Sequence, residues 1–202
     1  MQSLRKGSIM RNLDKQLFYS KLHSALIKKY GDSGKEIWKD AADEYDKIIS
    51  DKYYRTHKGA MAIPAVALYH SLSAHGMDAD RILQRYGDVM GNKLAKAVRK
   101  LTYIPFLEDV LWKNINSILH STSSPKKGYK RRITSQPPVM YGVDILSCPF
   151  HEICKKLGEE SAVLCICHMD KNYSKGFRKL KYERYSALPE GADCCEYKIR
   201  QR

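Results

Sequence analysis

The sequence predicts an α+β protein, with a helical N-terminal part followed by a small antiparallel sheet with short helices. Three observations lead to this prediction. Residues 1–121 carry apolar side chains at helical spacing. Residues 122–138 are rich in serine, proline and positive charge, and indicate a basic connection. Residues 139–202 form a Cys-rich α+β region of short alternating stretches, which we expect to pack with the helices as one compact unit.

The helical part divides into five predicted helices, because apolar residues recur every three or four positions. Gly31 and Gly76 suit the ends of the first and third helices, while Pro64 and Pro105 suit the first turns of the third and fifth. The apolar faces contain, in chain order, Tyr19, Leu22, Leu26 and Tyr30; Ile37, Ala41, Tyr45 and Ile48; Ala67, Leu68 and Leu72; Ile82, Leu83, Tyr86, Val89 and Met90; and Leu107, Leu111, Ile115 and Ile118.

The fourth predicted helix contains two glycines. It would begin after Asp78, whose carboxylate can accept a hydrogen bond from a free backbone N–H group of the first turn. Gly87 and Gly91 interrupt the pattern and predict that this helix weakens or breaks before Leu94.

The Cys-rich part is predicted to contain three strands and two short helices. In chain order these are a strand at 139–147, a helix from Pro149 to Leu157, a helix at 159–169, and strands at 179–188 and 194–200. The segment 189–193 contains proline and glycine and predicts a turn. We expect this turn to join the last two strands in an antiparallel hairpin.

The chain is basic, with a formal net charge of +14. Such a surface attracts anions, including nucleic acids, phosphates and carboxylate substrates. Residues 126–132 contain five Lys and Arg residues with Tyr129 between them. Charge interleaved with an aromatic ring is one way to bind single-stranded nucleic acid, but the sequence contains no recognised nucleic-acid-binding motif. We therefore interpret the charge as a solvated surface and expect no nucleic-acid partner.

The sequence predicts neither a membrane span nor a secretory signal. The longest apolar-rich run, residues 60–69, is far shorter than the roughly 20 residues that a transmembrane helix needs. The first residues are polar and no apolar signal core follows them. We expect a cytoplasmic protein whose thiols stay reduced. A cluster of reduced thiols suggests metal binding or nucleophilic catalysis.

All six cysteines lie in the last 55 residues, from Cys148 onward. Cys148 precedes Pro149 at a predicted strand-to-helix junction. The positive end of the helix dipole would lower the pKa of a thiol there and favour the thiolate. This position makes Cys148 the first candidate for chemistry.

Four of the other cysteines form two pairs, and the two members of each pair must face different directions. Cys165 and Cys167 are two residues apart and cannot share one face of a helix, and Cys194 and Cys195 are neighbours on a strand that point to opposite sides. One thiol of each pair can therefore face a cleft, which with Cys148 makes about three usable thiols. The remaining thiols, including Cys154, are expected to pack as small core residues.

Two histidines and one aspartate are candidate bases. His151 follows Cys148 by three residues, so both side chains can face the same way on a short helix. His168 lies next to Cys167, and Asp170 ends a mostly apolar segment. Each could take a proton from a thiol or a water molecule. CxxC and HxxxH spacings are absent, so a metal site would need three thiolates and Asp170 or a histidine to meet in space.

The order of these residues resembles a known family. Cys148-Pro149, Cys167-x-x-Asp170, the stretch 177–185 and Gly191-x-x-Cys194-Cys195-x-Tyr197 are similar to the C-terminal signature of the L-2-amino-thiazoline-4-carboxylic acid hydrolase family. The last motif also resembles vinyl-reductase-type small-molecule-binding domains, whose cysteines hold zinc. The hydrolase resemblance selects Cys148, Cys167, Asp170 and Cys195, and leaves out the other three cysteines.

The resemblance implies hydrolysis of a cyclic, isothiourea-like carboxylate to N-carbamoyl-L-cysteine. In one route, zinc or iron held by Cys148, Cys167 and Cys195 activates a water molecule, and Asp170 takes its proton. In the other, Cys148 attacks the substrate with His151 or Asp170 as base. The partner is then a small anionic substrate, whose carboxylate would be met by one of two cations, Arg178 or Arg184.

Two other functions are consistent with the same residues. One is a sensor module that binds a small molecule or metal without turnover, as the vinyl-reductase-type resemblance implies. The other is a basic helical protein that binds anions or nucleic acid through residues 126–132. The first predicts stoichiometric ligand and no product, and the second predicts salt-sensitive binding.

Overall fold

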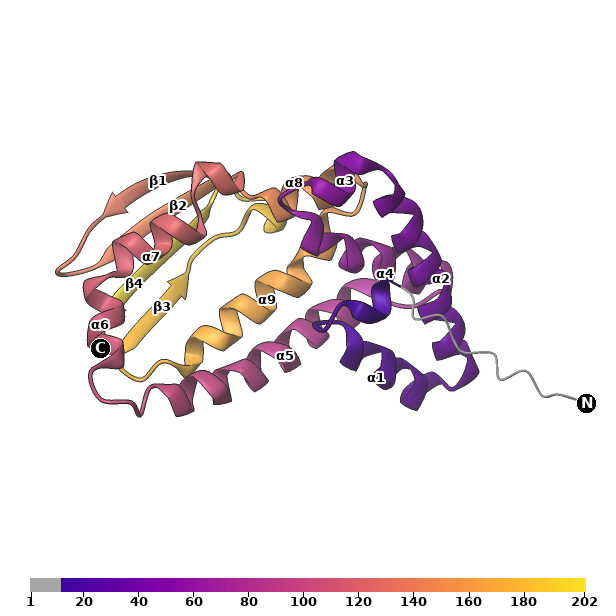
Figure 1. The fold of residues 1–202 in the computed structure, drawn as a ribbon, viewed down its shortest axis with the longest axis horizontal. Coiled ribbons are helices and arrows are strands. Elements are labelled where there is room, and N and C mark those ends of the chain that lie inside the picture. Colours follow the sequence, from indigo (N-terminus) through magenta and orange to yellow (C-terminus); the bar gives the residue numbers. More distant parts are fainter. Residues whose placement is uncertain (1–11) are drawn as a thin grey trace, which may run out of the picture.

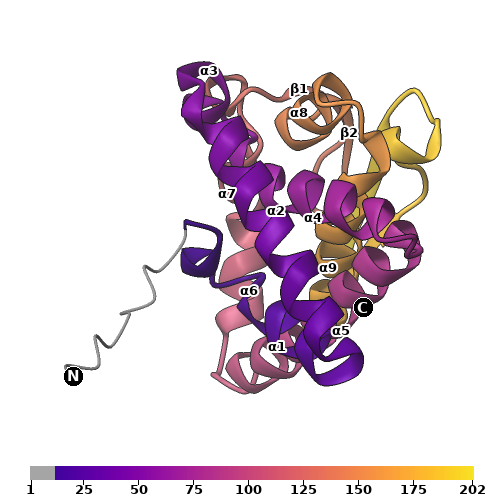
Figure 2. The same cartoon turned by 90° about the vertical axis from the view of Figure 1, so that its right-hand side faces the viewer.

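The computed structural model describes residues 12–202 and confirms the predicted α+β class. The helices and strands are α1 (Ser20–Tyr30), α2 (Asp32–Ser50), α3 (Lys52–Thr56), α4 (Ile63–Ala74), α5 (Ala79–Leu101), α6 (Leu107–Lys113), α7 (Ile115–Thr122), β1 (Lys130–Ser135), β2 (Tyr141–Ser147), α8 (Pro149–Lys156), α9 (Leu164–Tyr173), β3 (Leu180–Arg184) and β4 (Cys195–Gln201). Helices dominate one end of the molecule and the sheet forms the other (Figure 1; Figure 2 gives the view turned by 90°).

Most predicted helices of the N-terminal half are present, with three differences, in the fifth predicted helix, at α3 and in α5. The predicted fifth helix is two shorter helices, α6 and α7, which meet at Asn114. Helix α6 begins after Phe106, which has a left-handed backbone, rather than at Pro105. The short helix α3 was not predicted, because its five residues bury no side chain and carry no apolar pattern.

Helix α5 corrects the expected break at the two glycines. It runs without interruption from Ala79 to Leu101, and Asp78 caps it as predicted by accepting a hydrogen bond of 3.0 Å from the Arg81 backbone N–H. The glycines are points of close approach to α9. A Cβ atom on Gly87 would lie 2.2 Å from the Cys165 carbonyl oxygen, and one on Gly91 would lie 2.5 Å from that of Met169.

This close approach makes the effect of Gly87→Ala the reverse of the usual one. Alanine at an exposed interior helix position is more favourable than glycine by about 1 kcal/mol. Here the new methyl group would push α5 away from the backbone of α9, and we expect the free energy of unfolding to fall by about 1–3 kcal/mol. Urea denaturation measures the change, with Asn92→Ala on the exposed side of α5 as the control. Equal stability of Gly87→Ala and wild type would contradict this packing.

The four strands form one antiparallel sheet in the order β1-β2-β4-β3. The predicted hairpin of the last two strands is present as β3 and β4, which pair from Arg184 with Tyr197 to Leu180 with Gln201. Strand β1 was not predicted, since it lies inside the segment expected to be only a connection. It is an edge strand whose outer face is basic, and Arg132 forms an ion pair of 2.7 Å with Asp144 of β2. Exposed charge of this kind protects a sheet edge from pairing with other chains.

Two apolar cores meet at α9. The larger core joins helices α1, α2, α4, α5, α8 and α9. The smaller one joins Trp112 and Ile115 of the α6–α7 pair to one face of the sheet, where it includes Tyr141, Leu180 and Ile199. Helix α9 (Leu164–Tyr173) follows a 3-10 turn at Glu160–Val163. The helix predicted at 159–169 is therefore displaced toward the C-terminus. Its Cys165 belongs to the larger core, while Asp170 faces the sheet side.

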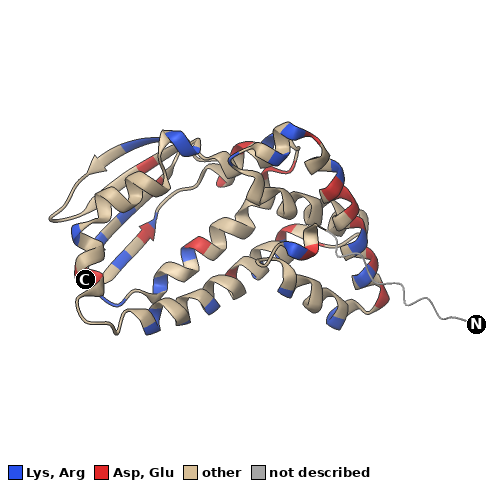
Figure 3. Cartoon of the chain, in the orientation of Figure 1, with Lys and Arg blue, Asp and Glu red and all other residues tan. Residues whose placement is uncertain are grey.

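Basic residues are distributed over several elements. Figure 3 shows Lys and Arg along α1, α5 and the sheet, with acidic residues interspersed on α2. No helix in the described part of the chain is long and apolar enough to cross a membrane.

Candidate active site

A cavity of about 290 Å³ lies where β2, α8, α9 and β4 meet, and we call it the thiol cavity. All five predicted catalytic residues line it, and they come from α8 with its N-cap residue, from α9 and from β4: Cys148, His151, Cys167, Asp170 and Cys195. The remaining walls are mostly apolar, with Tyr129 and Tyr197 as further polar groups. The local arrangement follows from the sequence, since β2 ends at the thiol that precedes α8 and β4 begins at Cys195.

Cys148 is the N-cap residue of α8, with Pro149 in the first turn as predicted. Burial raises the pKa of its thiol, and this effect exceeds the opposing effect of the N–H groups of His151 and Phe150. The expectation of a ready thiolate at the helix end is therefore wrong in direction, because removing the charge from water costs more than the helix end returns. The Tyr129 hydroxyl donates a hydrogen bond to Cys148 and also lowers the thiol pKa.

The two cysteine pairs sort as their spacing predicted. Cys165 is fully buried in the helical core, while Cys167 faces the thiol cavity. Burial raises the pKa of Cys167 to about 12, against the attraction of the Arg184 guanidinium. Cys195 also faces the cavity, and its sulfur accepts a hydrogen bond of 3.3 Å from the Leu188 backbone N–H.

The other thiols lie elsewhere. Cys154 is fully buried in the helical core, as predicted for a small packing residue. Cys194 was expected to pack in the same way, but it is only half-buried and does not line the cavity. Cys194 is therefore a suitable control residue for substitutions of the thiols that line the cavity, including its neighbour Cys195.

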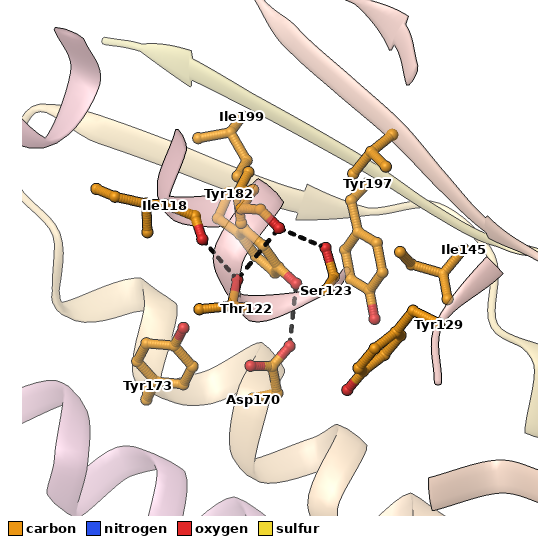
Figure 4. A pocket seen from close by; sticks show the side chains of 12 residues that line it. Ile118, Thr122, Ser123, Tyr129, Ile145, Asp170, Tyr173, Tyr182, Tyr197 and Ile199 are labelled. Carbon is orange, nitrogen blue, oxygen red and sulfur yellow. Dashed lines mark hydrogen bonds between the residues drawn. The ribbon is translucent and has the colours of Figure 1, made fainter. Parts of the chain in front are cut away.

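Asp170 is held by α9 at the bottom of the cavity. Its Oδ2 accepts a hydrogen bond of 3.0 Å from the Tyr182 hydroxyl (Figure 4). Burial raises the pKa of this carboxyl group, and the Tyr182 hydrogen bond and the Arg184 charge oppose that rise. A carboxyl group with a raised pKa is a better proton acceptor near neutral pH than an ordinary aspartate.

The two candidate histidines differ in position. His151 lines the thiol cavity, but its Nε2 lies 2.5 Å from Oε1 of Glu160. His168 lies on the other side of α9, where its Nδ1 is 3.0 Å from Oδ1 of Asp88 on α5. The structure therefore brings His151 to the candidate site and leaves His168 outside it.

The two candidate arginines also separate. The Arg184 side chain is only 4% exposed, pairs with Glu190 at 3.2 Å, and attracts the charges of Cys167 and Asp170 from behind the cavity wall. Arg178 is exposed, and its guanidinium lies 4.4 Å from the centre of the Tyr103 ring. Arg178 is thus remote from the predicted site.

The predicted metal ligands share a cavity without forming a ligand set. Among residues 12–202, no group of three or more His, Cys, Asp or Glu side chains is arranged to hold a metal ion. The three thiols therefore do not form a zinc or iron ligand set in this arrangement.

The sequence did not identify the tyrosines as site residues, although Tyr197 was part of the family motif. Tyr182 and Tyr197 lie on paired strands with ring centres 5.3 Å apart, and Tyr129 was considered only as part of a basic run. The sequence did contain a pattern that could have identified Tyr182 and Tyr197. Tyr182 precedes Arg184 by two residues and Tyr197 follows Cys195 by two, which places each pair on one side of a strand.

Residues 53–199 match the model of a protein family described as L-2-amino-thiazoline-4-carboxylic acid hydrolase. The matched segment contains every residue that lines the thiol cavity. No curated protein sequence matches the chain.

Solved structures show distant likeness. A trafficking protein particle complex subunit 3 from Naegleria fowleri, covalently bound to palmitic acid, is 13% identical with a TM-score of 0.38, over 73% of this chain and 96% of that one. An H-NOX protein from S. oneidensis in the Fe(II)NO state is 14% identical with a TM-score of 0.42, over 93% of this chain and 98% of that one.

Proposed function

Because the chain belongs to the L-2-amino-thiazoline-4-carboxylic acid hydrolase family, we propose that it opens the ring of its substrate in the thiol cavity, with Cys148 as nucleophile and Asp170 as general base. Membership of this enzyme family implies hydrolysis of L-2-amino-thiazoline-4-carboxylate. One observation supports the assignment of roles: Cys148, Cys167, Asp170 and Cys195, which come from α8 with its N-cap residue, from α9 and from β4, line a single cavity.

The reaction begins at the ring carbon that lies between nitrogen and sulfur. Asp170 takes the proton of the Cys148 thiol, and the sulfur attacks this carbon. The bond from the carbon to the ring sulfur then breaks, and the released sulfur receives the proton. The product is an S-alkyl isothiourea that joins Cys148 to the opened substrate through the former ring carbon.

Water completes the reaction. A water molecule deprotonated by Asp170 attacks the same carbon, and the bond to the Cys148 sulfur breaks. The carbon keeps its two nitrogens and gains the oxygen, which gives N-carbamoyl-L-cysteine. The Cys148 sulfur recovers its proton, so the enzyme is regenerated with one water consumed.

Asp170 is better placed than His151 to act as this base. The His151 ring is engaged by Glu160. Tyr129 lines the cavity together with Cys148 and Asp170, and its hydroxyl donates a hydrogen bond to the Cys148 thiol.

Arg184 is better placed than Arg178 to attract the substrate carboxylate, acting from behind the cavity wall, where its guanidinium pairs with Glu190. Its buried guanidinium acts on Cys167, Asp170 and Tyr197 across the cavity wall. A buried cation attracts an anion more strongly than an exposed one, because little solvent screens it. Arg178 on the outer surface lacks this advantage.

Acid-quenched intact-mass spectrometry tests the proposed intermediate. We expect wild-type protein mixed with L-2-amino-thiazoline-4-carboxylate to gain the full mass of one substrate before N-carbamoyl-L-cysteine accumulates, with the added mass on the peptide that contains Cys148. Cys194→Ser should behave as wild type, because Cys194 lies outside the cavity.

Other outcomes would select other functions. Product without any transient adduct, together with one equivalent of zinc or iron whose removal abolishes activity, would favour the metal route. Stoichiometric binding without product would favour a sensor module. Binding that depends on salt and on the basic residues 126–132 would favour an anion-binding protein.

A further inference from the structure

A second cavity, of about 300 Å³, adjoins the thiol cavity, and we call it the tyrosine chamber. It lies between α7, α9 and one face of the sheet (Figure 4). Four tyrosines line it, together with aliphatic side chains of the sheet and of α7: Tyr129, Tyr173, Tyr182 and Tyr197. Thr122 and Ser123, at the end of α7, lie at its more exposed side.

The two cavities share the wall that contains the proposed base. Tyr129, Ile145, Asp170 and Tyr197 line both of them. Tyr173 and Tyr182 line only the tyrosine chamber. In Figure 4 the Asp170 carboxylate lies between Tyr173 on one side and Tyr129 and Tyr197 on the other, with the Tyr182 hydroxyl directly above it. Cys148 lines only the thiol cavity, whereas Asp170 lines both, so a ligand in the chamber can contact the carboxylate without occupying the space beside Cys148.

The charge of the chamber favours one class of ligand. Asp170 is the one Asp, Glu, Lys, Arg or His among the side chains that line it. Burial raises the pKa of each of the four tyrosines, so their hydroxyls remain neutral. An ionised carboxylate away from water is unfavourable unless a cation or several hydrogen bonds compensate it. Tyr182 supplies one hydrogen bond, and Arg184, which does not line the chamber, adds the attraction of its charge. The cavity space beside Asp170 can hold a cation in direct contact with the carboxylate.

Aromatic rings add to this preference. The face of a tyrosine ring attracts an organic cation by roughly 0.5–2 kcal/mol, depending on how far water is excluded. The chamber combines such rings with a carboxylate and excludes Lys and Arg from its described lining. We propose that the tyrosine chamber binds an organic cation, an amidinium, guanidinium or alkylammonium group, against Asp170.

A cation in the chamber would belong to a substrate larger than the thiazoline carboxylate alone. Ring opening would take place in the thiol cavity, while a cationic substituent extended past Asp170 into the tyrosine chamber. The cation binding follows from the chamber by itself, whereas the extended substrate rests on the proposed function. The two can fail separately, because binding is measurable in protein that does not turn over.

Calorimetry with benzamidine and its neutral counterpart benzamide tests the binding. In the Cys148→Ser background, we expect benzamidine to bind at least about 10-fold more tightly than benzamide. Tyr173→Ala in the same background should weaken benzamidine by about 5-fold or more, whereas Tyr173→Phe, which keeps the ring, should bind as the parent does.

The opposite results would overturn the proposal. Equal affinities for benzamidine and benzamide would show that charge is not recognised. Benzamidine binding that is unaffected by Tyr173→Ala would place the ligand outside the chamber. If cation binding holds while no thiazoline is hydrolysed by the wild type, the tyrosine chamber stands and the proposed function does not.

Discussion

Replacing Cys148 with serine is expected to lower kcat/KM for L-2-amino-thiazoline-4-carboxylate by about 10³-fold or more. The serine hydroxyl occupies nearly the same position but is a much weaker acid than a thiol. A carboxylate such as Asp170 cannot deprotonate it to a useful extent, so neither the attack nor the intermediate should form. Steady-state kinetics of the purified variant measure the loss, and the mass adduct should disappear with it.

Cys194→Ser is the matched control for this substitution. Cys194 is half-buried and lies outside the thiol cavity. Its replacement by serine makes the same thiol-to-hydroxyl change in the same part of the chain. Its kcat/KM should stay within about 2-fold of wild type, as is usual for a substitution away from any site. A Cys148→Ser enzyme that retained a tenth or more of wild-type activity would show that Cys148 is not the nucleophile.

The neutral state of Cys148 explains why Asp170 matters to this prediction. The thiol pKa is raised by burial, so the resting group is the protonated thiol and needs a base at the moment of attack. Cys167, with a pKa of about 12, is still harder to ionise. The cavity is therefore a mostly apolar pocket of neutral thiols in which Asp170 is the proposed base. It is not a cluster of preformed thiolates.

Much of this arrangement was predictable from local patterns. The spacing rules predicted that one of Cys165 and Cys167 would be buried and the other would face a cleft, and the family resemblance selected Cys167 as the one in the site. The junction at Pro149 was placed correctly. The alternation of the last strands predicted the β3–β4 hairpin. These features depend on neighbours within a few residues, and the periodicity of helices and strands is sufficient to describe them.

The features that were missed depend on partners far away in the chain. The unbroken α5 requires its glycines for contact with α9, some 80 residues later, and no local rule contains that contact. Strand β1 is hidden by its charge, because it lies at the sheet edge and has little apolar alternation. The pKa of Cys148 depends on how deeply the completed fold buries it, so the helix end alone gave the wrong direction.

Asp170→Asn is expected to lower kcat/KM by about 10²–10⁴-fold, the usual contribution of a general base. Asparagine keeps an oxygen that can accept the Tyr182 hydrogen bond, so the local structure should persist. It cannot take a proton at any pH in the working range. The loss should therefore appear in turnover, while circular dichroism and the free energy of unfolding remain close to wild type.

The pH profile separates a base from a structural carboxylate. Asp170 must be ionised to act, and burial raises its pKa above the ordinary value, so kcat/KM of the wild type should begin to fall at a higher pH than an exposed aspartate would give. The Tyr182 hydrogen bond lowers this pKa. Tyr182→Phe removes that bond and should move the acidic limb to still higher pH, while Tyr173→Phe should leave it in place.

An acidic limb that stays where it is in Tyr182→Phe would show that another group controls it. A shift with Tyr182→Phe alone identifies the carboxylate on α9 as the titrating base. Since Asp170 also borders the tyrosine chamber, a cation bound there should stabilise its ionised form, and benzamidine derivatives that leave the thiol cavity free should move the same limb to lower pH.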